Sequence, residues 1–249
     1  KSVSKNEQQL TSREIANNTW SFLRKKVSVF YLYYVFSYVL QVIAKLLFYN
    51  WSAGKAFDQA LRLIPNATLS FVGVVANSNY YISGNWYLSA MMIALLVLYP
   101  LLLKNYHLSS KLLFPLGAIF LMGHMYHNYT QVIVSYTDYT FMSTGLIRAL
   151  IEIAMGVSLF ELSKVIDSRK FNKVFMTLVK LFAYFVVFFY AFGHTDRSFD
   201  IHALLWCGVA VMLSFCESTF RIGESRLTRY LGKISLPIYI FHTVIMRLS

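Results

Sequence analysis

Three polar side chains lie at helical spacing near the end of the chain. Ser235, Tyr239 and His242 occur in an otherwise apolar stretch, and intervals of four and three residues place them on one face of a helix. Polar groups within a membrane helix are costly unless a ligand or a neighbouring group satisfies them. The face therefore indicates either a polar binding surface or, for His242, a hydrogen bond to another helix.

A second polar pair lies deep in another apolar run. Arg148 and Glu152 are one helical turn apart. An unpaired charge near the centre of a bilayer costs at least about 2.5–3.5 kcal/mol. Mutual neutralisation explains the pair by itself. The alternative is a polar cavity in which Arg148 binds an anionic or oxygen-rich group.

A third motif marks both ends of one apolar run. Asn85-Trp86-Tyr87-Leu88-Ser89 begins the run, and Leu98-Tyr99-Pro100-Leu101-Leu102 ends it. Trp and Tyr are common at membrane interfaces, so an aromatic belt explains the first segment alone. An aromatic belt does not explain why both segments occur at the two ends of one run, so their combination is a more specific signal than either segment alone.

The composition is that of a membrane protein. The 249 residues are 57% hydrophobic and only 14% charged, whereas a soluble domain carries about 25% charged residues. The net charge of +12 does not indicate nucleic acid, because the basic residues lie in short loops between apolar runs.

Seven runs approach the length of about 20 apolar residues that a membrane-spanning helix needs. They are 27–49, 86–103, 112–126, 141–164, 174–193, 201–217 and 230–247. We therefore predict an all-α, polytopic bundle with about seven spans. Basic residues enrich every second loop, so the positive-inside rule places the N-terminal end in the cytoplasm. The polar segment 1–21 is then a cytoplasmic segment, partly helical after Thr11.

Other features have simpler interpretations. Residues 53–63 have helical apolar spacing and are expected to lie along the membrane surface. Lys180 lies near the end of its run, so its ammonium is expected to reach water. His124 and His127 could share a metal, but two interfacial histidines are the favoured interpretation, since no carboxylate or cysteine lies nearby in the sequence. We expect no metal site.

Several of these stretches resemble the acyltransferase 3 family of integral membrane acyltransferases. The resemblance rests on the Trp86 and Tyr99 motifs, on Ile147-Arg148-Ala149-Leu150 with Gly156, and on Gly232-x-Ile234-Ser235-x-x-x-Tyr239-x-x-His242. It extends from about Phe22 to His242, and we interpret residues 1–249 as one acyltransferase 3-like membrane domain.

The resemblance implies transfer of an acyl group, usually acetyl from acetyl-coenzyme A, to a hydroxyl of a cell-envelope glycan. The substrate-binding candidates are Trp86, Ser89, Arg148, Glu152, Tyr239 and His242. Arg24, Lys25 and Lys26 are the candidates for binding the coenzyme A phosphates. The expected partners are membrane lipid, a glycan acceptor and acyl-coenzyme A, with no nucleic acid. The expected location is the bacterial cytoplasmic membrane.

The catalytic signature of the family is an Arg followed eleven positions later by a His. Leu or Ala occupies the position eleven residues before each of the six histidines. The pair is therefore absent from this chain, and we expect the chain to be a fragment that lacks the first membrane helices. Because acyl transfer to a hydroxyl needs a base, we expect this chain alone to be inactive.

Two other functions remain open at this point. A carrier or polymerase of lipid-linked glycans would use an aromatic cavity without acyl chemistry. A catalytically inactive homologue would act as an interaction protein.

Overall fold

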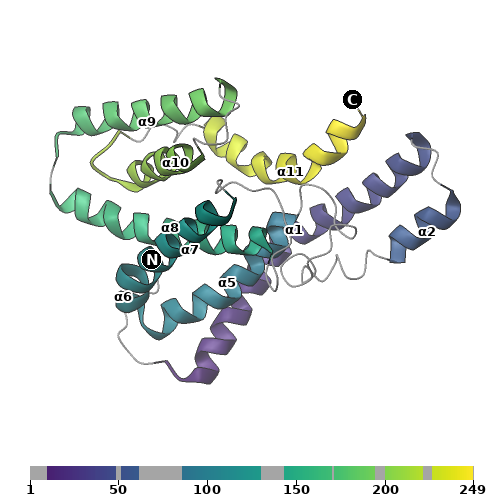
Figure 1. Ribbon diagram of the computed structural model, residues 1–249, viewed down its shortest axis with the longest axis horizontal. Helices are drawn as coiled ribbons and strands as arrows, with labels where there is room; N and C mark the ends of the chain where they lie inside the picture. Colours follow the sequence, from purple (N-terminus) through teal and green to yellow (C-terminus); the bar gives the residue numbers. More distant parts are fainter. Residues whose placement is uncertain are drawn as a thin grey trace. The chain divides into compact units, whose positions relative to one another are not determined.

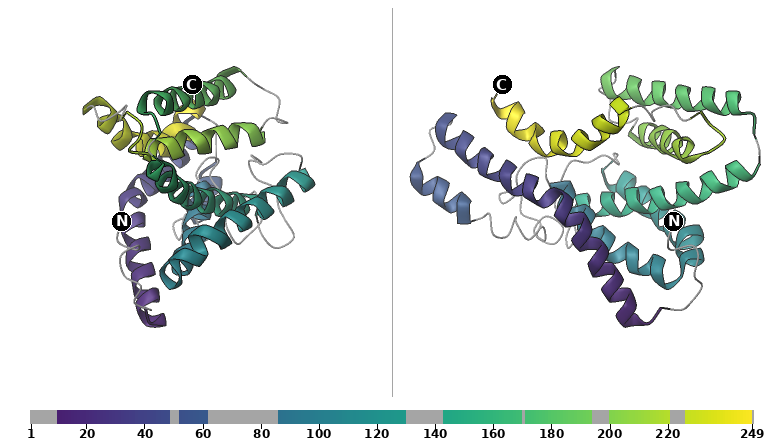
Figure 2. Two further views of the ribbon diagram at one scale, coloured as in Figure 1. Left: turned by 90° about the vertical axis from the view of Figure 1, so that its left-hand side faces the viewer. Right: turned by 180° about the vertical axis from the view of Figure 1, so that it is seen from behind.

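The structure is a computed structural model that describes residues 10–48, 52–61, 86–129, 143–169, 171–193, 200–220 and 226–248. Helices make up nearly all of these residues, and no β-strand occurs among them (Figures 1 and 2). The predicted all-α class is confirmed.

Helix α1 (Ser12–Phe48) is longer than the first predicted span because it includes residues 12–21 of the polar segment. A capping box begins it: the Thr11 N–H donates to Glu14 Oε2 over 2.8 Å, and the Glu14 N–H donates to Thr11 Oγ1 over 3.3 Å. Residues 12–21 are therefore helix continuous with the first span. Helix α2 (Ala53–Leu61) confirms the predicted helix, and its position along the membrane surface stays a prediction.

The next two helical stretches are separated by a break at Asn105. Helix α5 (Trp86–Lys104) ends at Asn105, whose backbone is extended and whose side chain accepts a hydrogen bond from the Leu108 N–H. Helix α6 (Tyr106–Leu108) continues through a π-helical turn, η2 (Ser109–Leu113), into α7 (Phe114–Tyr129). Pro115 follows the π-turn at once. A proline cannot donate to the carbonyl four residues earlier and clashes with it, which accounts for a wider turn here.

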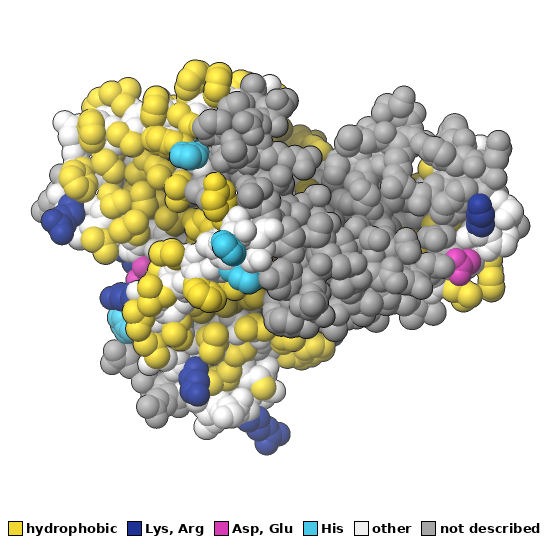
Figure 3. Space-filling model, viewed as in Figure 1, with side chains coloured by type: hydrophobic (Ala, Val, Ile, Leu, Met, Phe, Trp, Pro, Cys, Tyr) yellow, Lys and Arg dark blue, Asp and Glu magenta, His cyan; other side chains and the backbone are white. Residues whose placement is uncertain are grey.

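Three helices follow: α8 (Thr144–Ser168), α9 (Lys173–Gly193) and α10 (Asp200–Phe215). Asn172 caps α9 by accepting the N–H groups of Val174 and Phe175. Helices α9 and α10 pack side by side (Figures 1 and 2). Figure 3 shows hydrophobic side chains over the surface of this region, and those exposed on α9 include Leu178, Phe182, Phe185 and Phe189. Lipid is the solvent suited to such a face.

Helix α11 (Arg226–Leu248) completes the chain and contains Pro237. The helices form two compact units. The first unit comprises α1, α2, α11 and α5 as far as Pro100. The second comprises α6, η2, α7, α9, α10 and α8 from Ile147.

Each predicted span contains a helix, but the helices differ in how well they suit a bilayer. Within the described residues, four are long and apolar enough to cross a membrane: Ser12–Ala44, Tyr87–Lys104, Tyr106–Asn128 and Lys173–Tyr190. His202–Phe215 is apolar but shorter. Helix α8 is long enough, but Arg148, Glu152 and Glu161 fall within its first eighteen residues. The third predicted run, short and interrupted by Pro115, is among the four.

Candidate functional site

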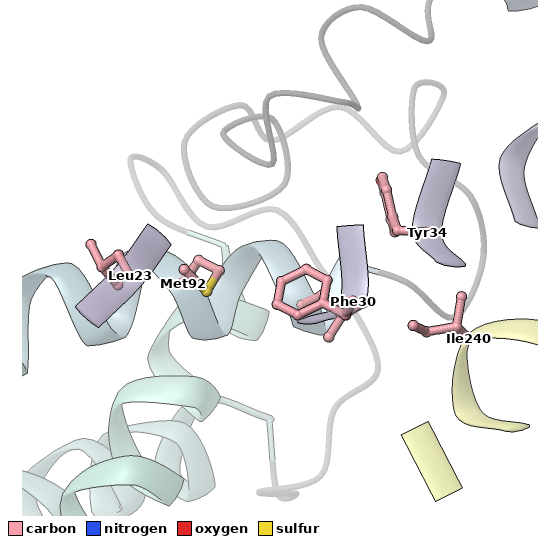
Figure 4. Close-up of a cluster of buried hydrophobic side chains, with 6 residues drawn as sticks. Leu23, Phe30, Tyr34, Met92 and Ile240 are labelled. Atoms are coloured by element: carbon pink, nitrogen blue, oxygen red, sulfur yellow. The ribbon is translucent and has the colours of Figure 1, made fainter. Parts of the chain in front are cut away.

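A cluster of buried side chains joins three helices of the first unit (Figure 4). Its members are Leu23, Phe30 and Tyr34 of α1, Leu88 and Met92 of α5, and Ile240 of α11. Leu236 and Tyr239 of α11 are partly buried against it. The cluster therefore brings the helix that begins at Trp86 together with the helix that carries the Tyr239 motif, although some 150 positions separate them in the sequence.

An aromatic stack adds a second contact between α1 and α5. The rings of Phe22 and Tyr99 lie 4.2 Å apart between centroids and are nearly parallel, at 9°. Offset stacking of this kind adds about 0.5–1.5 kcal/mol beyond the area that it buries. Because Phe22 precedes Arg24 by two residues, the stack places the basic triplet next to the Tyr99 end of α5.

One long-range hydrogen bond ties α1 to α11. Ser37 Oγ donates to the carbonyl oxygen of Ile240 over 3.0 Å, and both residues are buried. The bond helps to fix which face of α11 meets the cluster, and Ile240 points into that cluster as a result.

The structure places four of the sequence-predicted residues in this unit. Ser89 is buried on α5 and Tyr239 is half-buried on α11, and each has an interaction partner. Trp86 and His242 lie in the helices, but their side chains are outside the described set. The roles of all four stay predictions.

Ser235 differs from its predicted companions on the polar face. It is exposed, and its hydroxyl donates to the Gly232 carbonyl over 2.8 Å within the same helix. This bond satisfies the hydroxyl locally. Of the three residues of the predicted face, Tyr239 is the one whose side chain is seen against the core.

Arg148 and Glu152 form an ion pair in the second unit. Arg148 Nε lies 2.7 Å from Glu152 Oε1, and each side chain is about a quarter exposed, at 25% and 24%. The predicted neutralisation at one-turn spacing is thus present. The pair joins two residues of the same helix, and a substrate-binding role remains a prediction.

Arg24, Lys25 and Lys26 are all exposed on α1. Consecutive helical residues are about 100° apart, so the three side chains leave the helix in different directions. Lys26 Nζ lies 5.5 Å from the centre of the Phe22 ring, within the range of a cation–π contact.

The comparison with known families decides the classification. The family described as "Acyltransferase domain", Acyl_transf_3, matches residues 10–249. The chain belongs to this family. A search of curated proteins and a search of solved structures both found no match. The resemblance noted in the sequence is therefore confirmed, and the protein is a multi-pass membrane protein of an acyltransferase family.

The acyltransferase also contains a buried cation that sequence reasoning misinterpreted. Lys180 is only 4% exposed, so its ammonium does not reach water as expected. It donates instead to Thr219 Oγ1 over 3.4 Å and to the Phe220 carbonyl over 3.3 Å. The partners lie about forty residues away, and no local pattern around Lys180 indicated them.

The same turn, residues 216–220, receives further bonds from α8 and α9. Asp167 accepts the N–H groups of Glu217 and Ser218, and Thr177 Oγ1 accepts the Phe220 N–H over 3.0 Å. Burial raises the pKa of Asp167, but the two N–H bonds outweigh it, and the pKa is below its ordinary value. We call these bonds, with those of Lys180, the turn clamp. Its role is structural.

A further hydrogen-bond network, separate from the turn clamp, links α6 to α8. The Tyr106 hydroxyl donates to Glu161, and Glu161 also pairs with Lys164. Lys164 Nζ lies 3.4 Å from the Tyr106 oxygen. The spacing of Glu161 and Lys164 was a visible signal of an ion pair. The part played by Tyr106 was not, because it depends on which helices meet.

Proposed function

We propose that this acyltransferase moves an acyl group, with acetyl the first choice, from acyl-coenzyme A to a hydroxyl of a cell-envelope polysaccharide. The single observation that carries the proposal is the family match over residues 10–249. The packing of α1, α5 and α11 supports it, because these three helices bear most of the family-like motifs. The proposed location is the bacterial cytoplasmic membrane, with the N-terminal end of this chain in the cytoplasm.

In this proposal the basic triplet meets the donor. Arg24, Lys25 and Lys26 are exposed at the part of α1 that precedes its apolar stretch. Cationic side chains form strong, charge-assisted hydrogen bonds with phosphate oxygens. Coenzyme A carries several phosphates, so this segment suits the cytoplasmic end of the donor path.

The acceptor and the acyl chain would be bound by Trp86, Ser89, Tyr239 and His242, with Arg148 and Glu152 as the charged pair. Acyl transfer needs a base to take the hydroxyl proton and donors to stabilise the oxyanion that develops. Tyr239 and Arg148 are suited to donate hydrogen bonds. We assign the base to none of these residues.

The test compares cells with and without the gene for the intact protein. Mass spectrometry of the envelope polysaccharide should show acetyl or other acyl groups that disappear on deletion and return on complementation. Complementation with Tyr239→Phe should restore them less well, whereas Ser235→Ala, which removes an exposed and locally bonded hydroxyl, should restore them fully. Unchanged acylation together with lost export of the glycan would reject the proposal and favour a carrier.

A further inference from the structure

Two stripes can be distinguished among the exposed side chains of α1. Val29, Leu32, Phe36, Ile43 and Leu47 are between 44% and 76% exposed and recur at intervals of three, four or seven residues. This spacing puts them on one face of the helix. An apolar stripe along a membrane helix is the face that meets lipid. We call it the lipid stripe.

The second stripe lies on the N-terminal half of α1 and combines cations with an indole. Arg13, Asn17, Trp20 and Arg24 are all exposed, at intervals of four, three and four residues. Trp20 is 69% exposed. Within the described part of the chain, no ring contact of Trp20 and no ion pair of Arg24 is found. We call this set the Trp20 stripe. Figure 2 shows the helix that carries it, in purple.

The two stripes face different directions. At about 100° per residue, Trp20 is rotated about 120° from Leu32, and Arg24 about 80°. Lys25 is rotated only about 20° from Leu32 and so extends the lipid stripe. An interfacial tryptophan is usually a lipid anchor, but an anchor would be expected in line with the lipid stripe. The indole of Trp20 is not.

The order of groups along the Trp20 stripe matches the chemistry of the donor. Trp20 and Arg24 are one helical turn apart, about 6 Å along the axis. Arg24 is the nearer of the two to the apolar part of α1. In coenzyme A the phosphates likewise lie between the adenine base and the pantetheine arm that carries the acyl group.

We propose that Trp20 stacks on the adenine base of the acyl donor, and that Arg24 is the residue of the basic triplet that binds its phosphates. This inference rests on the proposed function. It divides the triplet: Lys25 lies in line with the lipid stripe, and Lys26 is held over the Phe22 ring. Arg13 and Asn17 extend the stripe beyond the base. The indole thereby selects a donor that carries adenine.

The experiment measures binding rather than turnover. The full chain, in nanodiscs of neutral lipid, is titrated with coenzyme A and separately with 4′-phosphopantetheine, which has a phosphate but no adenine. Because base stacking on an aromatic ring is worth about a factor of ten or more in affinity, Trp20→Ala should weaken coenzyme A about tenfold. It should leave 4′-phosphopantetheine unchanged. Trp20→Phe should restore most of the affinity.

Two further variants complete the design. Arg24→Ala should weaken both ligands, because both carry phosphate. Phe57→Ala removes an aromatic side chain of similar exposure, 67%, on α2, and should change neither. Circular dichroism of each variant serves as the check that it is folded.

The outcomes separate this inference from the proposed function. Equal coenzyme A affinity in wild type and Trp20→Ala, with loss in Arg24→Ala, would overturn the stacking role and keep the donor site. An equal loss of both ligands in Trp20→Ala would also overturn it, because the indole would not be reading adenine. Absence of coenzyme A binding by the wild-type chain would reject the donor site itself.

Discussion

Different kinds of interaction stabilise the interior of each of the two units of the acyltransferase. In the first unit, α1, α5 and α11 meet through apolar and aromatic side chains, with the Ser37–Ile240 bond as a polar tie. In the second unit, a smaller apolar cluster between α9 and α10 is accompanied by the turn clamp. Burial alone therefore does not mark a functional polar group. Lys180 is buried because it holds a turn.

The comparison also separates two kinds of charge in the second unit. Lys180 and Asp167 connect different elements, whereas Arg148 and Glu152 connect two turns of one helix. Loss of a connecting group should lower stability. Loss of Arg148 leaves Glu152 unpaired, so its effect on activity is to be measured in a variant that is shown to be folded.

The largest effect is expected from opening the apolar cluster of the first unit. Phe30→Ala should lower the free energy of unfolding by about 3 kcal/mol, because it leaves a cavity among packed side chains. Thermal unfolding in detergent measures this as a lower Tm. Val29→Ala, at the neighbouring 60% exposed position, is the control and should change Tm little. A similar decrease in Tm in both variants would show that the cluster is not the stabilising core of the first unit.

Arg148→Ala tests whether the ion pair within α8 has a role in activity, in contrast to the structural role of the turn clamp. If Arg148 binds the substrate, acylation by the intact protein should fall about a hundredfold, equivalent to about 2.7 kcal/mol of transition-state stabilisation. The measurement is the rate of label transfer from acetyl-coenzyme A into glycan in membrane vesicles. Full activity in a folded variant would leave only charge neutralisation as the role of the pair.

Asp167→Ala removes the acceptor for two N–H groups of the turn clamp. The expected cost is about 1–2 kcal/mol, since unsatisfied N–H groups lose their bonds at a partly exposed site. Glu217→Ala is the matched control, because it keeps the backbone N–H that Asp167 accepts. Equal Tm values for the two variants would contradict a clamp.

The same carboxylate predicts a pH dependence with a definite sign. The pKa of Asp167 is lower in the folded protein than in the unfolded chain, so the unfolded chain binds a proton first as the pH falls. The stabilisation is present above the ordinary aspartate pKa of about 3.9 and is lost below it. The difference in Tm between wild type and Asp167→Ala should therefore shrink from pH 5 toward about pH 3. If the difference in Tm grew as the pH fell, the pKa of Asp167 would not be lower in the folded protein.

The smallest effect is expected for the polar tie of the first unit. Ser37→Ala should cost about 1 kcal/mol, because the Ile240 carbonyl loses a buried donor. Ser28→Ala is the control, since that exposed hydroxyl donates only to the Lys25 carbonyl in its own helix. If Ser37→Ala leaves Tm and activity unchanged, the rotation of α11 depends on apolar packing alone.

Much of the secondary structure was predictable. The run 86–103 became α5 at Trp86–Lys104, and 53–63 became α2 at Ala53–Leu61. The helix predicted after Thr11 begins at Ser12, behind a capping box of Thr11 and Glu14. The motif that carries Tyr239 was correctly placed on a helix, but the exposure of Ser235 was not foreseen. Neighbours from other helices decide exposure, and spacing within one helix does not contain that information.

The sequence by itself determined the helices and the family. Backbone groups within lipid must be bonded inside their own segment, so a long apolar run leaves the chain little choice but a helix. Only the tertiary structure decided which faces meet. It stacked Phe22 on Tyr99, turned Ile240 toward Ser37 and buried Lys180 beside Thr219. These contacts depend on the packing of side chains far apart in the chain, and local hydropathy does not specify such partners.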